Sequence, residues 1–206
     1  MTYLELTKLL QCETPSQYLS NEYIKEKLFE LIPELEMCDG FKQHSAWHPY
    51  DVFEHTYRVV DGVENDLSLR LAALFHDIGK PETYNPEFRD NKEIGHFPKH
   101  WEKSDLIFNE FARKHEIDEA TRDLVSRLIL FHDVRFKYPI SDEEAFSELN
   151  KDLIECLTSI FTEEELKKLY ALRRADLSAQ TKPHDYKLDN DLEENTILKR
   201  YGSMVK

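Results

Sequence analysis

The chain has 206 residues, which suits one domain or one domain with a short appendage, and 40% of them are hydrophobic, enough for a sizeable core. Acidic residues outnumber basic ones by 41 to 27, and the resulting net charge of −14 disfavours extended nucleic acid and anionic membranes as partners. A small anionic substrate is compatible with this charge, because a bound metal ion inverts the local potential.

The cysteines and the first residues indicate a compartment. Cys12, Cys38 and Cys156 are widely spaced, odd in number and form no CxxC pair, which is typical of reduced thiols in a cytosolic protein. The stretch from Met1 to Leu6 lacks a basic leader, and no segment approaches the roughly 18 apolar residues of a membrane span. We therefore expect a cytoplasmic protein with no signal peptide and no membrane partner.

The hydrophobic pattern predicts an all-α fold. Only five glycines occur and strand-like alternation is scarce, whereas apolar residues recur at helical spacing along most of the chain. A polar and aromatic loop over 40–49 and a charged, proline-containing stretch over 81–99 are the expected irregular segments. The expected helices cover about 2–11, 17–32, 50–63, 67–78, 100–115, 118–133, 142–160, 162–180 and 189–204.

The helix over 50–63 carries a histidine on its apolar face. Val52, His55 and Val59 share one side by the i, i+3, i+4 rule, so the imidazole points inward. A single inward histidine is more often hydrogen-bonded in a core than bound to a metal. The metal assignment of His55 therefore depends on inward partners elsewhere in the chain.

The helix over 67–78 is apolar along its length and is expected to stop at Gly79 and Pro81. His76 and Asp77 lie in its expected last turn, where the helix dipole favours a cation. Burying an adjacent imidazole and carboxylate is costly without a partner, and a divalent metal is the usual one. Capping contacts with backbone groups are the alternative explanation.

Further histidines occupy the ends of the next two helices. His132 follows an apolar run, much as His76 follows its own helix. His100 begins the helix over 100–115, and His96 lies four residues earlier. Because Pro98 separates them, we expect His100 to be a ligand and His96 to lie beside the ligands.

Asp176 interrupts an apolar stripe on the helix over 162–180. It continues the face formed by Leu169 and Leu172, and a buried unpaired aspartate is rare. Either Arg173 or Arg174 neutralises it, or a metal does. Both arginines point elsewhere on a helical wheel, which favours the metal.

Together these positions form a candidate metal set. Imidazole and carboxylate ligands without a thiolate suit one or two divalent ions of Fe, Mn, Ni, Co, Zn or Mg rather than a closed structural zinc site. An open site of this kind activates water and polarises an oxyanion, which predicts metal-assisted hydrolysis. The candidate ligands are His55, His76, Asp77, His100, His132 and Asp176.

The order of these residues resembles a known family. His55, the His76-Asp77 pair within His-Asp-Ile-Gly-Lys-Pro, and Asp176 within Arg-Ala-Asp are similar to the H…HD…D signature of the HD-domain metal-dependent phosphohydrolases. That resemblance implies an all-α HD-domain helical bundle in which the central helices converge on the metals.

A narrower likeness concerns two longer segments. Residues 47–56 and 96–104 resemble the HD region of bacterial tRNA nucleotidyltransferases and poly(A) polymerases, and the whole likeness spans roughly 44–180. We expect a single domain in which 1–43 and 181–206 are helical extensions. The related enzymes carry an N-terminal head with a glycine-rich entry and paired aspartates, which the first 40 residues here lack, so nucleotidyl transfer is not expected.

The resemblance also implies roles for individual residues. His55, His76, Asp77 and Asp176 would hold one metal, and Asp77 would bridge to a second. His100 and His132 best match the ligands that two-metal members add. Lys80 resembles the family lysine that approaches the substrate phosphate, with a solvated lysine as the alternative. The candidate catalytic residues are thus Asp77, Lys80 and His76.

The predicted function is hydrolysis of a small phosphate ester by metal-activated water, with a nucleotide monophosphate, a cyclic nucleotide or a dinucleotide as substrate. The ligand set does not choose between phosphomonoesters and phosphodiesters. We expect substrate walls from the two irregular segments and phosphate contacts from Lys80, Lys99, Arg135 and Lys137, each of which is alternatively a plain surface charge.

Two other functions would use the same residues. A di-iron oxygenase of the HD type would need the same six ligands, and a nucleotide-sensing or interaction module would keep a vestigial site. The presence of every ligand of the signature favours an enzyme.

Overall fold

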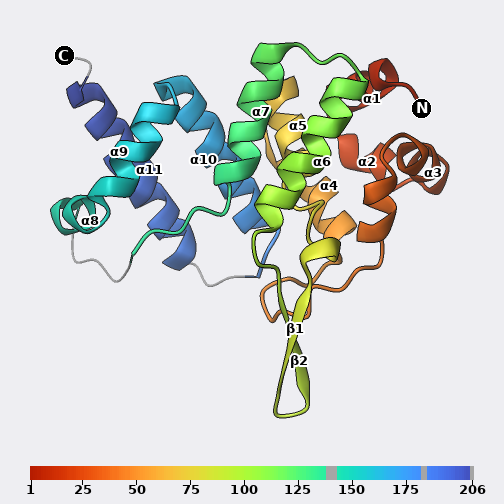
Figure 1. Ribbon diagram of the computed structural model, residues 1–206, viewed down its shortest axis with the longest axis horizontal. Helices are drawn as coiled ribbons and strands as arrows, with labels where there is room; N and C mark the ends of the chain where they lie inside the picture. The colour runs from red at the N-terminus through yellow and green to blue at the C-terminus, as the bar shows by residue number, and fades with distance from the viewer. Residues whose placement is uncertain (138–142, 182–184, 205–206) are drawn as a thin grey trace.

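Five helices pack side by side at the centre of the molecule. They are α4 (Val52–Gly62), α5 (Leu67–Phe75), α6 (His100–Lys114), α7 (Glu119–Phe131) and α10 (Glu163–Ser178). The computed structural model describes residues 1–137, 143–181 and 185–204. Within these residues α5 contacts each of the other four helices (Figure 1). The predicted all-α fold is confirmed, since the sheet found in the described part of the chain has two short strands.

The central helix α5 is buried on every side, as its apolar sequence predicts. Asp66 caps it by accepting a hydrogen bond from the Leu69 backbone N–H at 2.9 Å, and every residue from 69 to 75 is buried. Each fully buried leucine or phenylalanine side chain stabilises the fold by about 1.5–3 kcal/mol. The C-terminal end of α5 is therefore a rigid support for the residues that follow it.

Further helices cover this bundle on two opposite sides (Figure 1). The N-terminal group comprises α1 (Tyr3–Leu10), α2 (Pro15–Leu19), α3 (Glu22–Leu31) and the 3-10 helix η1 (Pro33–Cys38), and the C-terminal group comprises α8 (Glu143–Leu149), α9 (Lys151–Ile160) and α11 (Asp185–Met204). Among the described residues, no helix combines the length and the apolar character needed to cross a membrane.

The helix expected over 17–32 is divided in two. α2 ends at Leu19 and α3 begins at Glu22, because the Asn21 side chain accepts a hydrogen bond from the Ile24 backbone N–H and caps a new helix. The apolar residues keep helical spacing across this break, so the periodicity did not indicate it.

A second expected helix, over 142–160, is divided at Asn150. The Asn150 side chain accepts a hydrogen bond from the Lys137 backbone N–H at 2.8 Å and donates one to the Phe146 carbonyl at 3.1 Å. A buried asparagine that satisfies backbone groups in this way competes with a continuous helix. It also ties the start of α9 to the segment that follows α7.

The stretch over 81–99, expected to be irregular, contains a β-hairpin. After the 3-10 turn η2 (Pro81–Thr83), β1 (Asn85–Arg89) pairs in antiparallel fashion with β2 (Lys92–His96). Asp90 and Asn91 join the strands with φ of 50° and 58°, as in a two-residue type I′ turn. This turn lacks the glycine that usually marks it in a sequence.

The hairpin projects from the bundle, and its base is fixed to the loop before α4 (Figure 1). The Gly95 backbone N–H donates a hydrogen bond to the His44 carbonyl at 3.1 Å. A Cβ atom at Gly95 would lie 2.3 Å from the Gln43 carbonyl oxygen, so only glycine allows this approach. The loop over 40–49 and the stretch over 81–99 therefore pack against each other at the base of the hairpin.

Candidate metal centre

The predicted ligands lie on the inner faces and at the ends of the central helices. α4 carries His55, α10 carries Asp176, and α6 begins with His100. His132 directly follows α7. The three histidines are buried and Asp176 is partly buried, so helices far apart in the sequence bring metal-binding side chains into the core.

His76 and Asp77 follow α5 instead of lying in its last turn, which corrects the expectation from the sequence. The helix ends at Phe75, and the Ile78 backbone N–H donates to the Phe75 carbonyl in the turn that comes next. Because the chain leaves the helix here, Asp77 turns into the bundle and is only 2% exposed.

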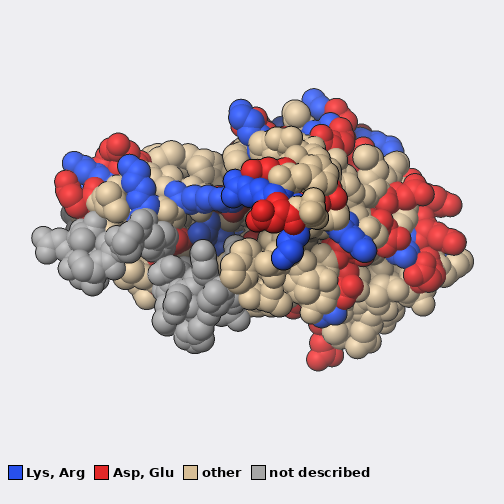
Figure 2. Space-filling model, turned by 90° about the horizontal axis from the view of Figure 1, so that it is seen from below, with Lys and Arg blue, Asp and Glu red and all other residues tan. Residues whose placement is uncertain are grey.

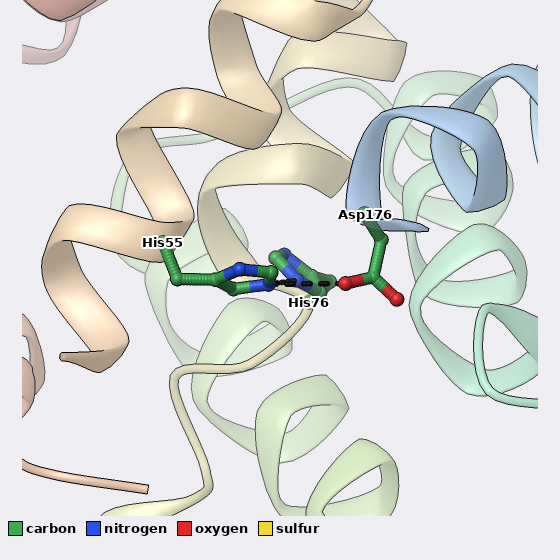
Figure 3. A group of neighbouring side chains, drawn as sticks. All are labelled: His55, His76 and Asp176. Carbon is green, nitrogen blue, oxygen red and sulfur yellow. Dashed lines mark hydrogen bonds and ion pairs between the residues drawn. The ribbon is translucent and has the colours of Figure 1, made fainter. Parts of the chain in front are cut away.

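His55, His76 and Asp176 form the first ligand group (Figure 3). His55 Nε2 lies 3.3 Å from His76 Nε2 and 3.1 Å from Asp176 Oδ1. One ligand atom from each of the three residues lies within 4.8 Å of the others. This spacing allows all three to bind a single ion.

Asp77, His100 and His132 form the second ligand group, under the same 4.8 Å limit. His100 Nε2 lies 3.3 Å from His132 Nε2 and 3.2 Å from Asp77 Oδ1. All three side chains are buried. The second group therefore repeats the first in composition, with two imidazoles and one carboxylate.

Asp77 connects the two groups through its two oxygens. Oδ1 faces the second group, 3.2 Å from His100 and 3.6 Å from His132. Oδ2 faces the first group, 3.2 Å from His76 Nε2 and 3.4 Å from His55 Nε2. A carboxylate placed in this way bridges two cations, which is the arrangement of a two-metal site.

The hydrogen bonds of three of the histidines leave their Nε2 atoms available as ligands. In each case Nδ1 lies beside the carbonyl of the residue three positions earlier, which places a proton on Nδ1 and, in the neutral imidazole, leaves the Nε2 lone pair for a metal. The Nε2 atoms of His100 and His132, 3.3 Å apart, are satisfied by a shared proton or by a metal ion. The ligand set thus fits divalent metal ions. The contacts are His76 to Ala73 at 2.7 Å, His100 to Phe97 at 3.0 Å and His132 to Ile129 at 2.7 Å.

The charges of the site favour a cation in the same place. Burial opposes the charged form of His55, but hydrogen bonds to Asp176 and Asp77 outweigh it and raise the pKa of His55 to about 9. Burial also opposes ionisation of both aspartates, yet neighbouring histidines and, for Asp77, Lys80 hold the pKa of each carboxyl well below its usual range. Two ionised carboxylates thus persist in a buried pocket.

Two close glycine contacts set the distances between the ligand-bearing segments. A Cβ at Gly79 would lie 2.6 Å from the His100 carbonyl oxygen and 2.7 Å from the Ser104 nitrogen. A Cβ at Gly62 would lie 2.9 Å from the Ala175 Cβ. Glycine therefore lets the turn after α5 pack on α6, and lets α4 pack on α10 beside the aspartate of the first group.

Four of the six ligands, Asp77, His100, His132 and Asp176, line a cavity of about 580 Å³. The loop before α4 contributes Ser45 and His48 to its wall, and the hairpin region contributes a second wall. Figure 2 shows the face toward which the hairpin projects, where basic side chains gather near the centre of a mixed surface. The remaining lining residues include Lys80, Asn85, His96, Phe97, Trp101, Asp133, Arg135 and Gln180.

The other residues singled out from the sequence fall in different places. Lys80 lines the cavity and is buried, with its Nζ 2.6 Å from Asp77 Oδ2. His96 and Arg135 also line it, but their side chains are 51% and 83% exposed.

Lys99 and Lys137 are not brought to this cavity, whose described lining contains neither of them. The Lys99 backbone has φ of 59°, and its side chain, 70% exposed, pairs with Glu102 at 3.0 Å.

Neither arginine next to Asp176 neutralises it. Arg173 donates to the His132 carbonyl at 3.0 Å and pairs with Glu193, whereas Arg174 pairs with Glu194. Asp176 instead faces His55 and the first ligand group.

Three residues of the site were not singled out individually, although two of them lie in the loop over 40–49 that was expected to form a substrate wall. Gln43 accepts a hydrogen bond from Lys80 Nζ at 2.8 Å, and Gln180 donates one to Asp176 Oδ1 at 2.6 Å. The His48 ring lies 5.9 Å from the His55 ring, and burial lowers the pKa of His48 to about 4. His48 lies in the motif that carries the family resemblance, which was the available signal, whereas the two glutamines have no periodic pattern that would mark them.

Helices converging on two histidine groups that share one aspartate define a metal-binding helical domain. The family model described as HD domain matches residues 46–200, and the chain belongs to this family. HD domains bind divalent metals, and the family consists generally of metal-dependent hydrolases of the phosphohydrolase superfamily.

Curated relatives match the HD region alone. The chain is 31% identical over 134 residues to the "Multifunctional CCA protein" of Dechloromonas aromatica (strain RCB), covering 62% of this chain and 31% of that protein. It is 30% identical over 135 residues to the "Multifunctional CCA protein" of Pseudoalteromonas atlantica (strain T6c / ATCC BAA-1087), covering 63% and 32%. The aligned part of the chain thus spans about a third of these relatives.

Proposed function

We propose that the protein is a metal-dependent phosphohydrolase that acts on a small phosphate ester, a nucleotide in the form of a monoester or a diester. The observation that carries this proposal is the position of Asp77, whose two oxygens face two separate histidine pairs. Such an arrangement suits the clamping of one phosphate between two cations.

In this reaction the two ligand groups would hold the metal ions, and other residues of the cavity would hold the substrate. Bound divalent ions would activate water and stabilise the charge that develops on the phosphate. The two ligand groups fix the positions of those ions through buried side chains. Lys80, which lines the same cavity, supplies a positive charge for a phosphate oxygen.

The size and the charge of the site support a small substrate. A cavity of about 580 Å³ is in the range of sites for small molecules and cofactors. The overall charge of −14 opposes long polyanions, whereas the ions and Lys80 make the cavity itself attractive to one phosphate group. Aromatic side chains on the cavity wall, Phe97 and Trp101, offer apolar surface to a base.

The HD family supports metal-dependent hydrolysis, and the relatives support no wider activity for this chain. The word "multifunctional" in their name describes proteins about three times as long as the part that matches here. We therefore restrict the proposal to the reaction that the ligand groups can support.

The test combines metal analysis with a substrate screen. Elemental analysis of the purified protein should find a divalent metal, and a screen of nucleoside monophosphates, cyclic nucleotides and dinucleotides with Mn²⁺, Ni²⁺, Co²⁺ or Mg²⁺ should find phosphate-ester cleavage. Asp77→Asn should abolish cleavage, while Glu110→Gln, at an exposed position of α6, should keep it. Metal-loaded protein that cleaves none of these esters would contradict the proposal. Iron with oxygen uptake would instead identify an oxygenase.

A further inference from the structure

The ammonium group of Lys80 and a metal ion in the first ligand group would compete for the same oxygen of Asp77. Lys80 Nζ lies 2.6 Å from Asp77 Oδ2, and this is the oxygen that faces His55 and His76. Two positive charges on one buried carboxylate oxygen repel each other strongly, because little water screens them. An ion in the first group therefore weakens the contact between Lys80 and Asp77.

Gln43 provides the second polar contact of this lysine. Its Oε1 accepts a hydrogen bond from Lys80 Nζ at 2.8 Å, and its own side chain is buried, with the residue 1% exposed. The amide is neutral, so it holds the ammonium group without cancelling the charge. The ring of Phe97 adds a cation–π contact, with Nζ 5.5 Å from its centroid.

The position of Gln43 is independent of the metal ligands. The bridge between Lys42 and Asp51 closes the loop that contains it, and Gln43 Nε2 donates to the Tyr50 carbonyl at 3.4 Å. Its own carbonyl packs against Gly95 at the base of the hairpin. Metal binding at the ends of the helices thus leaves the Gln43 amide in place.

We propose that Gln43 is a positioning residue for Lys80. When an ion binds the first ligand group, Lys80 exchanges its contact with Asp77 for a substrate phosphate, and Gln43 keeps the ammonium group at the cavity wall. Metal binding and phosphate binding are then coupled through one side chain, each favouring the other. This inference rests on the proposed metal-dependent function and names the group that links the ion to the substrate.

The first test measures binding of Mn²⁺ and of inorganic phosphate by calorimetry, without any turnover. Lys80→Met should bind Mn²⁺ about three- to tenfold more tightly, because the competing charge is gone, and should bind phosphate at least about tenfold more weakly. Gln43→Leu should weaken Mn²⁺ binding about two- to fivefold. In this variant Lys80 has lost its hydrogen bond to Gln43 and keeps only its contact with Asp77, where it competes with the ion. Phosphate should again bind more weakly.

A double-mutant cycle separates this role from simple packing. If Gln43 acts through Lys80, then Gln43→Leu has no further effect on either affinity in the Lys80→Met background. Additive effects would overturn the proposal. Lys103→Met is the matched control: Lys103 pairs with Glu82 at 2.7 Å and does not belong to the described lining of the cavity, so both affinities should stay within about twofold.

A structure of the Mn²⁺-loaded wild-type protein tests the same point without a risk of misfolding. Lys80 Nζ should be beyond hydrogen-bonding distance of Asp77 Oδ2 and still within it of Gln43 Oε1. Retention of the Asp77 contact in the loaded protein would overturn the exchange. Loss of hydrolysis in the substrate screen would count against the proposed function alone, because these binding measurements require no reaction.

Discussion

The same three residues, Phe-His-Asp, stand where two neighbouring helices stop: Phe75 and Phe131 are the last residues of α5 and α7, and the aspartates that follow serve different purposes. In both α5 and α7 the histidine Nδ1 lies 2.7 Å from the carbonyl three residues earlier, and both Nε2 atoms belong to a ligand group. The aspartates differ. The side chain of Asp77 is 2% exposed and bridges the two groups, whereas that of Asp133 is 30% exposed and pairs with Arg135 at 3.2 Å.

The residues that follow each aspartate explain the difference. After Asp77, Ile78 is buried and the Gly79 backbone N–H donates to Ser104 Oγ at 3.0 Å, which draws the turn against α6. After Asp133 no glycine allows such an approach, and Arg135 is exposed. The tripeptide therefore supplies the imidazole, and the exit from the helix decides whether the carboxylate is buried.

The largest expected effect comes from neutralising the two aspartates separately. Asp77→Asn removes the charge shared by both ligand groups, so the protein should lose both ions and more than about a hundredfold of any hydrolytic activity. Asp133→Asn should keep both ions, because Asp133 lines the cavity but belongs to neither ligand group. Elemental analysis and initial rates measure this, and equal losses in the two variants would refute the distinction.

Replacing the two histidines should have a smaller effect on metal content. His76→Ala removes a ligand of the first group and His132→Ala a ligand of the second, so each variant should bind one Mn²⁺ ion where the wild type binds two. Titration by calorimetry or by Mn²⁺ electron spin resonance gives the stoichiometry. Loss of both ions from His132→Ala would show that the groups do not fill independently.

The sequence located the side chains that the structure brings together, for a physical reason. Inward histidines and a carboxylate on an apolar stripe stand out because burial without a partner is costly, and this applies to His55 and Asp176 alike. The all-α fold followed from helical periodicity in the same way. The signal is strong wherever a polar group breaks a regular apolar pattern.

Contacts made by loops lacked such a signal. Gln43 is recognisable as a partner of Lys80 only after the hairpin base has packed against its loop. The hairpin itself turns through Asp90 and Asn91 without a glycine. Lys99 adjoins a ligand in sequence, yet its side chain is 70% exposed, pairs with Glu102 and is absent from the described lining of the cavity. Proximity along the chain therefore predicted less than helical periodicity did.

Gly79→Ala tests whether the close packing of the turn after α5 on α6 stabilises the fold. In Gly79→Ala the added Cβ would lie 2.6 Å from one backbone atom of α6 and 2.7 Å from another, and neither can move cheaply. We expect a loss of about 2–4 kcal/mol in the free energy of unfolding, together with weaker metal binding as the turn shifts. Urea denaturation of the metal-free protein measures the first effect and calorimetry the second.

Gly202→Ala is the matched control for this substitution. A Cβ at Gly202 in α11 would meet nothing within 4 Å, and alanine is the better helix former by about 1 kcal/mol. This variant should be as stable as the wild type or slightly more so. A similar loss in both glycine variants would mean that the close packing on α6 is not what Gly79 provides.

Ion pairs to α10 also hold both helices in the bundle. α5 is buried along its length, and its cap Asp66 pairs with Lys168 of α10 at 2.6 Å. α7 is tied to α10 by a partly exposed ion pair, in which Arg127 contacts Glu165 at 2.6 Å. The hydrogen bond from Arg127 outweighs the opposing effect of burial and lowers the pKa of Glu165 to about 2.

The smallest expected effect is a change in the free energy of unfolding when the charge of Glu165 is removed, and it depends on pH. A carboxyl whose folded pKa is depressed contributes stability above its unfolded pKa, near 4.5, and loses that contribution as the pH falls toward 2. Glu165→Gln keeps the size of the side chain and removes its charge. It should cost on the order of 1–2 kcal/mol at pH 7, allowing for screening by water, and progressively less between pH 5 and pH 3. Glu163→Gln, on the first turn of the same helix, should change little at any pH. A deficit in Glu165→Gln that is equally large at pH 3 and pH 7 would show that packing, and not charge, holds α7 against α10.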